Sequence, residues 1–598
     1  MFIRLPGLLL FAVLLLVGCS EKKDAQPEDH KWWKESIVYQ IYPRSFKDSD
    51  GDGIGDLKGI ISRLDYIKSL GVDVVWLNPI YSSPNDDNGY DISDYRNIMK
   101  DFGTMSDFDS LLKGMHDRHM RLVMDLVVNH TSDEHAWFKQ SRSSRDNPYR
   151  NYYHWWNEER GKPTPRWSFF DVNSDAWKYD SVTRAYYLHY FSRKQPDLNW
   201  ENPEVRKEVY QVMKFWLDKG IDGFRMDAFQ FVAKDTTWPV FPPGYDQHII
   251  KYYGMGPHLH DYLQEMNREV ISKYDIMTVA EGAGSTLDDA MALVDPARHE
   301  LNMAYHFEGM DVGNFDPNYS LLDFKRVYTK WDSAFEEKGW VSVYLGNHDQ
   351  PRMLSHWGND DPRYREASSK MLTTFLLTMR GTPYCYYGDE LGMSNIKFDR
   401  ISDYRDIATI NKFKHLSQTG GDTAAFIQEQ KRSARDNGRT PFQWDNSPNA
   451  GFTTGTPWLK VNPDYITVNA AAQEKDESSV LSYFRKAVQL RKANPALVYG
   501  RYTILDRDNP SVYAYTREDG QKKLLVLLNF KSAPGSFVLP ADIDLGRAKV
   551  VLSNYPAAAG GATTGGATAG GAQSNSGAGT GGSQPLRPYE AIVYELVR

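Results

Sequence analysis

Short runs of β-branched and aromatic residues alternate with amphipathic stretches between Trp32 and about Pro495. A short apolar run bounded by turn residues is typical of a buried strand, and apolar residues three or four positions apart are typical of a helix. The strand-like runs are residues 37–41, 72–77, 122–128, 223–227, 276–281, 301–307, 340–346 and 382–387. These eight alternations predict an α/β fold, a (β/α)8 TIM barrel.

Two of the intervening stretches, 57–70 and 205–219, show a helical period, and each is followed by a glycine, which often ends a helix. Residues 129–199 break the alternation directly after the third strand, because they are rich in Trp, Tyr, Asn, Arg and Pro. We therefore expect a catalytic barrel over 32–128 and 200–495, with an inserted subdomain at 129–199.

After residue 495 the pattern changes to short strands separated by turn residues, at 512–516, 523–529, 548–553 and 591–596. This predicts a C-terminal all-β sandwich domain over 496–598. Residues 556–585 interrupt it with a run of Gly, Ala, Thr and Ser that has no apolar face to pack. We expect a low-complexity loop there, without a catalytic role.

Composition and charge exclude several classes of function. The 598 residues are 41% hydrophobic, which excludes a disordered chain. Lys and Arg number 70 against 78 Asp and Glu, and no basic block occurs, so nothing indicates binding to nucleic acid or to an anionic membrane. The two cysteines, Cys19 and Cys385, are too few for a disulfide framework.

The N-terminus resembles an export signal. Arg4 precedes an apolar run, 8–17, that is too short to span a bilayer. The sequence Leu-Val-Gly-Cys at 16–19 resembles a bacterial lipobox, in which the cysteine becomes the lipidated first residue. We expect a lipoprotein signal peptide at 1–19, a polar tether at 20–31, and a periplasmic or cell-surface lipoprotein whose only membrane contact is a lipid anchor at Cys19.

Acidic residues stand at the ends of several predicted strands, which in a (β/α)8 barrel is where reactive groups lie. Asp227 ends the fourth run, Glu281 ends the fifth, and Asp349 follows the seventh, with His130 similarly placed after the third. Glycoside hydrolysis requires two such carboxyls, one ionised and one protonated. Arg225, two residues before Asp227 on the same side of the strand, would hold that carboxyl ionised.

The sequence at this point resembles the α-amylase superfamily. The matching motifs are DLVVNH (125–130), QPDLN (195–199), GFRMDAF (223–229), AEG (280–282) and NHDQPR (347–352). Three further stretches are similar specifically to its α-glucosidase and oligo-1,6-glucosidase branch: 83–95, 435–445 and 449–463.

The resemblance implies a retaining reaction in which Asp227 is the nucleophile, Glu281 the general acid and then base, and Asp349 the group that stabilises the transition state. It also implies that Tyr90 stacks on the terminal glucose, that His130 and His348 bind its hydroxyls, and that Asp87 and Arg435 close the pocket. Arg439 is a further candidate in the same motif. A closed pocket admits only a chain end, so we expect an exo-acting enzyme for small α-glucosides and maltooligosaccharides.

The linkage expectation depends on Ala228, which follows the predicted nucleophile. A small residue there is similar to α-1,4-specific members, which favours maltose and maltooligosaccharides. The alternatives are an oligo-1,6-glucosidase acting on isomaltose and panose-type links, and a trehalose- or trehalulose-forming isomerase. A non-catalytic relative of amino-acid transporter heavy chains is disfavoured by the presence of all three acidic residues.

One acidic loop carries a separate prediction. Residues 48–56 alternate carboxylates with flexible residues, so that hard oxygen ligands can converge on one cation. An EF-hand is excluded because its twelfth position is Gly59 rather than Glu. In the resembling family this loop binds a structural Ca²⁺, with Mg²⁺ as the alternative, through Asp48, Asp50, Asp52, Asp56 and the carbonyl of Ile54.

Overall fold

The structure is a computed structural model that describes residues 30–172, 175–556 and 582–597. Its centre is a parallel sheet in which each strand pairs with the next along the chain. The strands are β1 (Val38–Ile41), β2 (Val74–Leu77), β5 (Arg121–Val127), β9 (Gly223–Asp227), β10 (Met277–Glu281), β11 (Met303–Tyr305), β12 (Ser342–Tyr344) and β13 (Thr382–Tyr386). A bridge between Ala304 and Val341 joins β11 to β12 and closes the barrel. The predicted (β/α)8 TIM barrel is confirmed.

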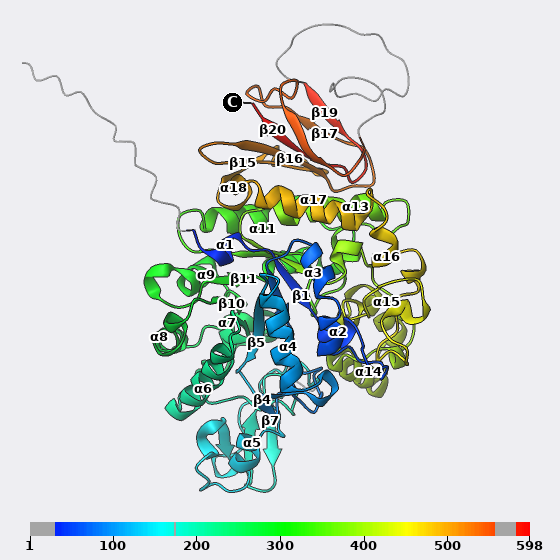
Figure 1. Cartoon of the computed structure of the whole chain (residues 1–598). Coiled ribbons are helices and arrows are strands. Elements are labelled where there is room, and N and C mark those ends of the chain that lie inside the picture. The colour runs from blue at the N-terminus through cyan, green and yellow to red at the C-terminus, as the bar shows by residue number, and fades with distance from the viewer. Residues whose placement is uncertain (1–29, 173–174, 557–581, 598) are drawn as a thin grey trace, which may run out of the picture.

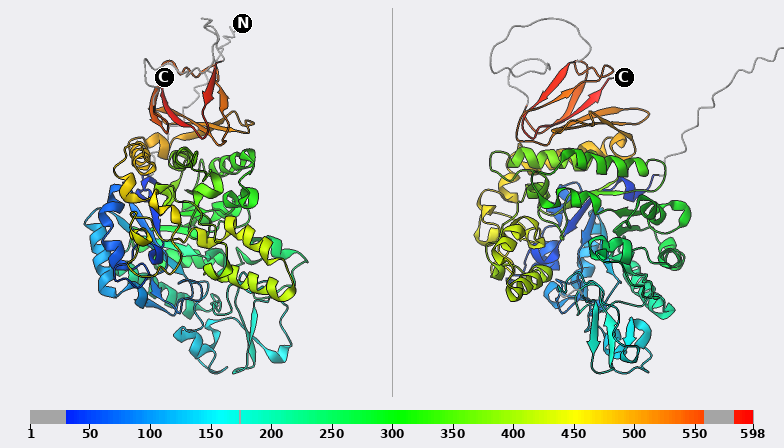
Figure 2. Two further views of the ribbon diagram at one scale, coloured as in Figure 1. Left: turned by 90° about the vertical axis from the view of Figure 1, so that its right-hand side faces the viewer. Right: turned by 180° about the vertical axis from the view of Figure 1, so that it is seen from behind.

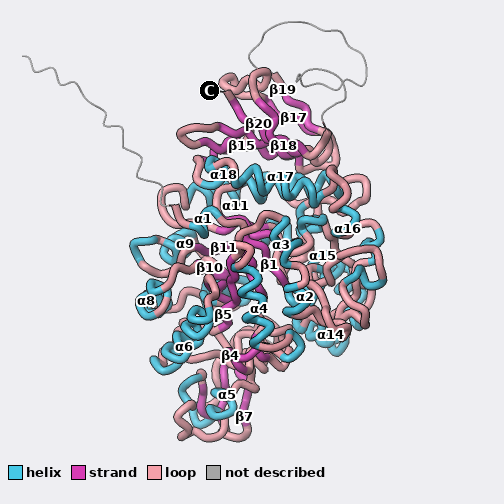
Figure 3. The backbone as a smooth tube through the Cα atoms, viewed as in Figure 1, coloured by secondary structure: helices cyan, strands magenta, loops and turns pink. Residues whose placement is uncertain are grey.

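Helices surround these strands, as the ring of cyan segments around the central magenta ones shows (Figure 3). The larger ones are α4 (Met105–His116), α6 (Pro203–Lys219), α8 (Leu259–Glu269), α9 (Leu287–Val294), α11 (Leu321–Ala334), α13 (Arg365–Thr378), α14 (Ile407–Thr419), α15 (Thr423–Ser433) and α17 (Val480–Lys492). Short ones are α1 (Trp32–Glu35), α7 (Ile249–Tyr253), α10 (Glu308–Asp311), α12 (Met353–Trp357), α16 (Ala470–Gln473) and α18 (Pro495–Val498). Helix α6 ends where the sequence predicted, at Gly220 in a left-handed conformation.

The stretch expected as one helix over 57–70 forms two short helices instead, α2 (Leu57–Ile61) and α3 (Leu64–Ser69). The break follows from local hydrogen bonding. The hydroxyl of Ser62 donates to the carbonyl of Gly59 at 2.6 Å, and the N–H of Arg63 binds the carbonyl of Ile60, three residues back, at 2.9 Å. These tight bonds replace the regular helical pattern at that turn.

The segment after the third barrel strand extends from one end of the barrel, at the bottom of Figure 1. It contains α5 (Ala136–Ser141) and an antiparallel sheet of β6 (Trp155–Asn157), β8 (Ala185–Leu188) and β7 (Trp177–Asp180). Before it, β3 (Tyr81–Ser82) and β4 (Asp94–Ile98) form a small hairpin after β2.

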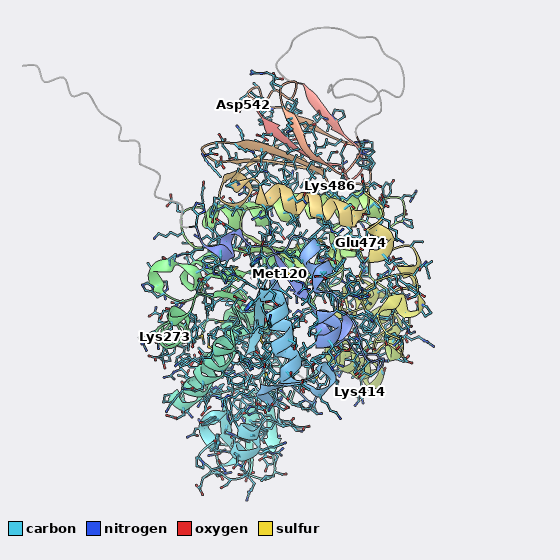
Figure 4. The ribbon with its side chains drawn as sticks, in the orientation of Figure 1. Met120, Lys273, Lys414, Glu474, Lys486 and Asp542 are labelled. Atoms are coloured by element: carbon cyan, nitrogen blue, oxygen red, sulfur yellow. The ribbon has the colours of Figure 1, made fainter. Side chains whose placement is uncertain are left out.

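The C-terminal residues form two antiparallel sheets at the opposite end of the barrel (Figure 2). Lys486 marks α17 beneath this domain, and Asp542 lies near its top (Figure 4). One sheet consists of β14 (Arg501–Leu505), β15 (Val512–Glu518), β16 (Lys523–Asn529), β20 (Ala591–Leu596) and β18 (Lys549–Ser553); the other consists of β17 (Gly535–Val538) and β19 (Ser583–Leu586).

Alternate residues of β15 and β16 explain this packing. Val512 and Leu525 face Phe537 and Leu586 of the second sheet, while Tyr513 packs against the core shared with the barrel helices. The predicted C-terminal all-β domain is therefore confirmed.

Candidate active site

The predicted reactive side chains meet at the carboxyl ends of the barrel strands. Asp227 is the last residue of β9 and Glu281 the last of β10, while Asp349 follows β12 in the loop that leads to α12. Parallel barrel strands all end at the same rim, which is why residues far apart in sequence come together here.

Arg225 links the carboxyls at the centre of the site. One of its terminal nitrogens lies 2.9 Å from Asp125 Oδ1 and 2.6 Å from Asp227 Oδ1, and the other forms an ion pair with Glu281. The hydroxyl of Tyr305 accepts from the same guanidinium at 2.8 Å. The side chain of Arg225 has no solvent exposure. A buried guanidinium thus fixes the relative positions of the two predicted catalytic carboxyls.

Burial shifts the pKa of both carboxyls upward. Desolvation raises the pKa of Glu281 to about 8, with a further contribution from the charge of Asp227, although Arg225 opposes the shift. Desolvation likewise raises the pKa of Asp227 to about 7, again against the effect of Arg225. Near neutral pH, burial and the repulsion between the two carboxylates therefore favour a single proton on the pair.

Asp349 lies in a different electrostatic setting. Its Oδ1 is 2.9 Å from Arg435 and 2.8 Å from Arg439, and its Oδ2 is 3.2 Å from Nε2 of His348. Although burial alone would raise it, the surrounding positive groups hold the pKa of Asp349 well below its usual range. Asp349 is consequently a permanent negative charge in the same pocket as the other two carboxyls.

The predicted sugar-binding residues lie around these acids. Tyr90 stacks on His348 with ring centroids 5.2 Å apart, and its hydroxyl lies 2.6 Å from His348 Nε2 and 3.0 Å from Asp125. His130 Nε2 is 3.1 Å from the carbonyl of Tyr90, and burial lowers its pKa to about 3, so its ring is neutral. Asp87 lies 3.7 Å from Arg435, and burial raises its pKa to about 7.

These groups enclose one pocket with about 380 Å³ of empty space, its mouth included. Aromatic and charged side chains share the wall, as expected for a sugar site in which apolar faces and hydroxyl partners are both needed. The lining residues are Asp87, Tyr90, His130, Phe170, Phe191, Asp227, Ala228, Glu281, Asp349 and Arg435. The structure thus brings every predicted catalytic and sugar-binding residue into one site, with Arg225 and His348 behind the wall.

Several residues of the site were not predicted. Asp125 binds Arg225 and Tyr90, and Asp406 binds Arg435. Gln195 donates to Asp87 at 3.0 Å. Asp125 and Gln195 belong to the motifs DLVVNH and QPDLN, so the motifs contained the signal, whereas Asp406 belongs to none of them.

The acidic loop is partly gathered. Oxygen atoms of Asp48, Asp50 and Asp56 lie within 4.8 Å of one another. Among the residues that the structure describes, these three form a group that could bind a metal ion. Asp52 lies outside that group, where its carboxylate accepts from the N–H of Ile54 at 2.7 Å. Three convergent carboxylates are the donor type that a hard divalent cation prefers, so the residues present fit such an ion.

The comparisons with known proteins decide the family. The model of the alpha amylase catalytic domain matches residues 40–500, and that of the maltogenic amylase C-terminal domain matches residues 502–566. The chain belongs to the α-amylase family. It is accordingly a glycoside hydrolase.

Individual family members extend over nearly the whole chain. An oligo-1,6-glucosidase of Parageobacillus thermoglucosidasius is 54% identical over 534 residues, which cover 88% of this chain and 95% of the relative. An α-glucosidase of Pediococcus pentosaceus is 44% identical, covering 95% and 99%. The crystal structure of an isomaltulose synthase from Klebsiella sp. LX3 superposes with a TM-score of 0.87 at 45% identity, covering 95% and 100%. The relatives named oligo-1,6-glucosidase fit the predicted alternative better than the α-1,4 expectation.

The predicted signal peptide at 1–19, with Cys19, and residues 20–29 of the predicted tether lie outside the described residues, as do residues 557–581 of the predicted loop 556–585. The loop was predicted to extend too far, because Ser583–Leu586 form β19 and pair with β17. Within the residues that the structure describes, no helix is both long and apolar enough to cross a membrane. Lipid anchoring stays a prediction.

Proposed function

We propose that this glycoside hydrolase is a retaining, exo-acting oligo-1,6-glucosidase that releases α-glucose from the non-reducing end of isomaltose and panose-type saccharides. The observation that carries the proposal is the contact of Arg225 with both Asp227 and Glu281, which line one pocket together with Asp349. The 54% identity to a named oligo-1,6-glucosidase supports the linkage.

In this proposal Asp227 attacks the anomeric carbon while Glu281 transfers its proton to the glycosidic oxygen, and the carbon–oxygen bond breaks as the glucosyl–Asp227 ester forms. Glu281, now ionised, then takes a proton from water, which attacks the same carbon and releases Asp227. Two inversions give glucose in its original α configuration. The unequal pKa values of the two carboxyls suit these roles.

The other pocket residues would bind the glucose unit. Asp349, held ionised by Arg435 and Arg439, would stabilise the positive charge that develops on the sugar ring. Tyr90 and the neutral His130 offer a stacking face and a hydrogen-bond partner, and His348 is placed by Tyr90. Asp87 and Arg435 form an ion pair in the wall, which supports exo action.

The α-1,4 alternative keeps one supporting observation, the small side chain of Ala228 in the pocket lining. Ala228 has φ 45° and ψ 27°, a left-handed conformation that β-branched residues rarely adopt. The backbone thus favours a small residue whatever the linkage, so Ala228 is a weak indicator of specificity. The similarity to an isomaltulose synthase favours glucosyl transfer as a second candidate, because transfer would use the same covalent intermediate.

Product analysis tests these alternatives. The purified protein is incubated separately with isomaltose, panose, maltose, sucrose and trehalose, products are resolved by chromatography, and early anomers are read by NMR. The proposal requires α-glucose from isomaltose faster than from maltose. Faster release from maltose would support the α-1,4 alternative, new disaccharides from sucrose would support an isomerase, and β-glucose would exclude retention.

We further propose that Asp48, Asp50 and Asp56 bind a structural divalent cation, with Ca²⁺ as the first choice and Mg²⁺ as the second. The convergence of their oxygen atoms supports this site. Export as a lipoprotein is proposed on the sequence alone, and metabolic labelling with a fatty acid, compared between the natural protein and Cys19→Ala, tests it.

A further inference from the structure

Asp406 directly precedes the first residue of α14 and contacts Arg435 and Arg439, the two arginines that bind Asp349. Its Oδ1 accepts from Nε of Arg435 at 2.8 Å and from a second nitrogen of that guanidinium, and lies 3.8 Å from Arg439. Its Oδ2 accepts from the N–H and the hydroxyl of Thr409, each at 2.8 Å. Asp406 is 1% exposed, so these partners replace water. One carboxylate thus starts a helix and binds a guanidinium of the pocket.

The two arginines need this second carboxylate. Both donate to the same oxygen of Asp349, at 2.9 Å and 2.8 Å, and Arg439 also donates to the carbonyl of His348 at 2.8 Å. Two buried positive charges this close repel each other unless matched by negative charge. Asp349 and Asp406 accept hydrogen bonds from these guanidinium groups, and Asp87 lies farther away, 3.7 Å from Arg435. Removing Asp406 would take away the carboxylate that binds Arg435 through two nitrogens and leave its positive charge only partly balanced beside the sugar site.

Helix α14 also reaches the other side of Arg435. The side-chain amide of Asn411 donates to the carbonyl of Phe170 at 3.0 Å. The ring of Phe170 lies 5.1 Å from the guanidinium carbon of Arg435 and lines the pocket. Further along, Lys414 is exposed at the outer edge of the molecule (Figure 4). The first turns of α14 therefore contact the pocket wall while its later part faces solvent.

We propose that Asp406 is a positioning residue that holds Arg435 and Arg439 against Asp349, and that α14 places Phe170 over Arg435 through Asn411. The sugar-binding wall is then set by a helix that itself contributes no residue to the pocket lining. This inference rests on the proposed function for its activity assay, but not for its binding assay.

The test compares Asp406→Asn with a matched control, Asp422→Asn. The first variant removes the charge of Asp406 but keeps an oxygen that can accept from Thr409. Asp422 begins α15 as Asp406 begins α14, accepts from the N–H of Ala425 at 2.8 Å, and is exposed. Both variants alter a helix-capping carboxylate, while Asp406→Asn alone breaks the link to the arginines.

Glucose binding is measured by calorimetry, KM and kcat with isomaltose and maltose, and Tm by differential scanning calorimetry. We expect Asp406→Asn to weaken glucose binding and raise KM by roughly 10- to 100-fold, as when one partner of a buried charge pair is removed. We expect the glucose affinity and the KM of Asp422→Asn to stay within about twofold of those of the natural protein. A purely structural loss would lower the active fraction and hence kcat, without raising KM.

Unchanged KM and glucose affinity in Asp406→Asn would overturn the proposal, whatever happens to Tm. If this variant does not fold, Asp406→Glu and Asn411→Ala decide instead. The first keeps the charge but is one methylene longer, and the second releases Phe170, so at least one must raise KM about threefold or more. Absence of activity in the natural protein would contradict the proposed function, while its glucose affinity would still test Asp406.

Discussion

The backbone N–H of Ala228 donates a hydrogen bond of 2.8 Å to Oε2 of Glu281. The residue after the proposed nucleophile therefore also holds the proposed general acid, and the ends of β9 and β10 are tied together. Because the bond comes from a residue in a left-handed conformation, its geometry depends on a small side chain.

Ala228→Val is expected to destabilise the protein by about 1–3 kcal/mol, because a β-branched residue is strained at φ 45°. Thermal unfolding measures this loss. A shift of the N–H would also weaken its bond to Glu281 and lower kcat. If a small residue at this position favours α-1,4 links, as the resemblance implies, the larger valine should raise the ratio of isomaltose to maltose turnover.

Ala228→Gly is the control, because glycine adopts the left-handed conformation without strain. Its Tm should not fall as it does for valine. A valine variant that is as stable as the natural protein would contradict the conformational argument. An unchanged ratio of isomaltose to maltose turnover would show that the side chain at position 228 does not determine the linkage preference.

Glu281→Gln keeps the size of the side chain but cannot give a proton. With isomaltose or maltose, whose leaving groups are poor, kcat/KM should fall by roughly 10²- to 10⁴-fold. With p-nitrophenyl α-glucoside the loss in the first step should be much smaller, since p-nitrophenolate departs without protonation. Equal losses with both kinds of substrate would contradict the role of Glu281 as general acid, and burst kinetics with the aryl substrate would show whether release of the covalent intermediate has become limiting.

The barrel could be predicted from sequence because its strands are short, apolar and buried, and each leaves a clear run in the pattern. The helix α14 was not predicted, because within it only Thr409 is buried, so its packing leaves little signal in the sequence. The strand β19 begins inside the stretch predicted as a low-complexity loop, and its pairing with β17, on the far side of β18 in the sequence, depends on contacts that a local pattern does not contain.

In the site, Asp227 and Glu281 could be predicted because topology alone brings strand ends together. Asp125 lies 100 residues from its partner Arg225, and Asp406 lies 29 residues from Arg435. Buried ion pairs of this kind are set by tertiary packing, and a lone aspartate in the sequence is equally compatible with a helix cap. Asp406 caps α14 and also binds Arg435, and the sequence around it indicates only the capping role.

Removal of a bound divalent cation should lower stability. If Asp48, Asp50 and Asp56 hold Ca²⁺, chelation should reduce the free energy of unfolding by about 2.7 kcal/mol relative to a solution at 100 times the Kd. Thermal unfolding with a chelator and with added Ca²⁺ or Mg²⁺ measures the effect and identifies the ion.

Asp50→Asn should abolish the response to the cation, whereas Asp52→Asn, outside the group of three, should retain most of it. If Asp52→Asn lost the response and Asp50→Asn kept it, the result would support the ligand role that the sequence predicted for Asp52. A Tm that does not respond to either ion or to the chelator would contradict a structural cation at this loop.

The pH dependence of kcat/KM should be bell-shaped and centred between neutral and mildly alkaline pH. Activity is lost at low pH as Asp227, whose pKa burial raises to about 7, becomes protonated and can no longer attack. It is lost at high pH as Glu281, whose pKa burial raises to about 8, gives up the proton that the leaving group needs. Because the two carboxyls interact, the acid and alkaline limbs of the profile report on the pair rather than on either residue alone.

In Glu281→Gln, assayed with the aryl glucoside, the alkaline limb should disappear while the acid limb remains. An alkaline limb that persists in this variant would assign the proton to another group and contradict the pairing of roles proposed here.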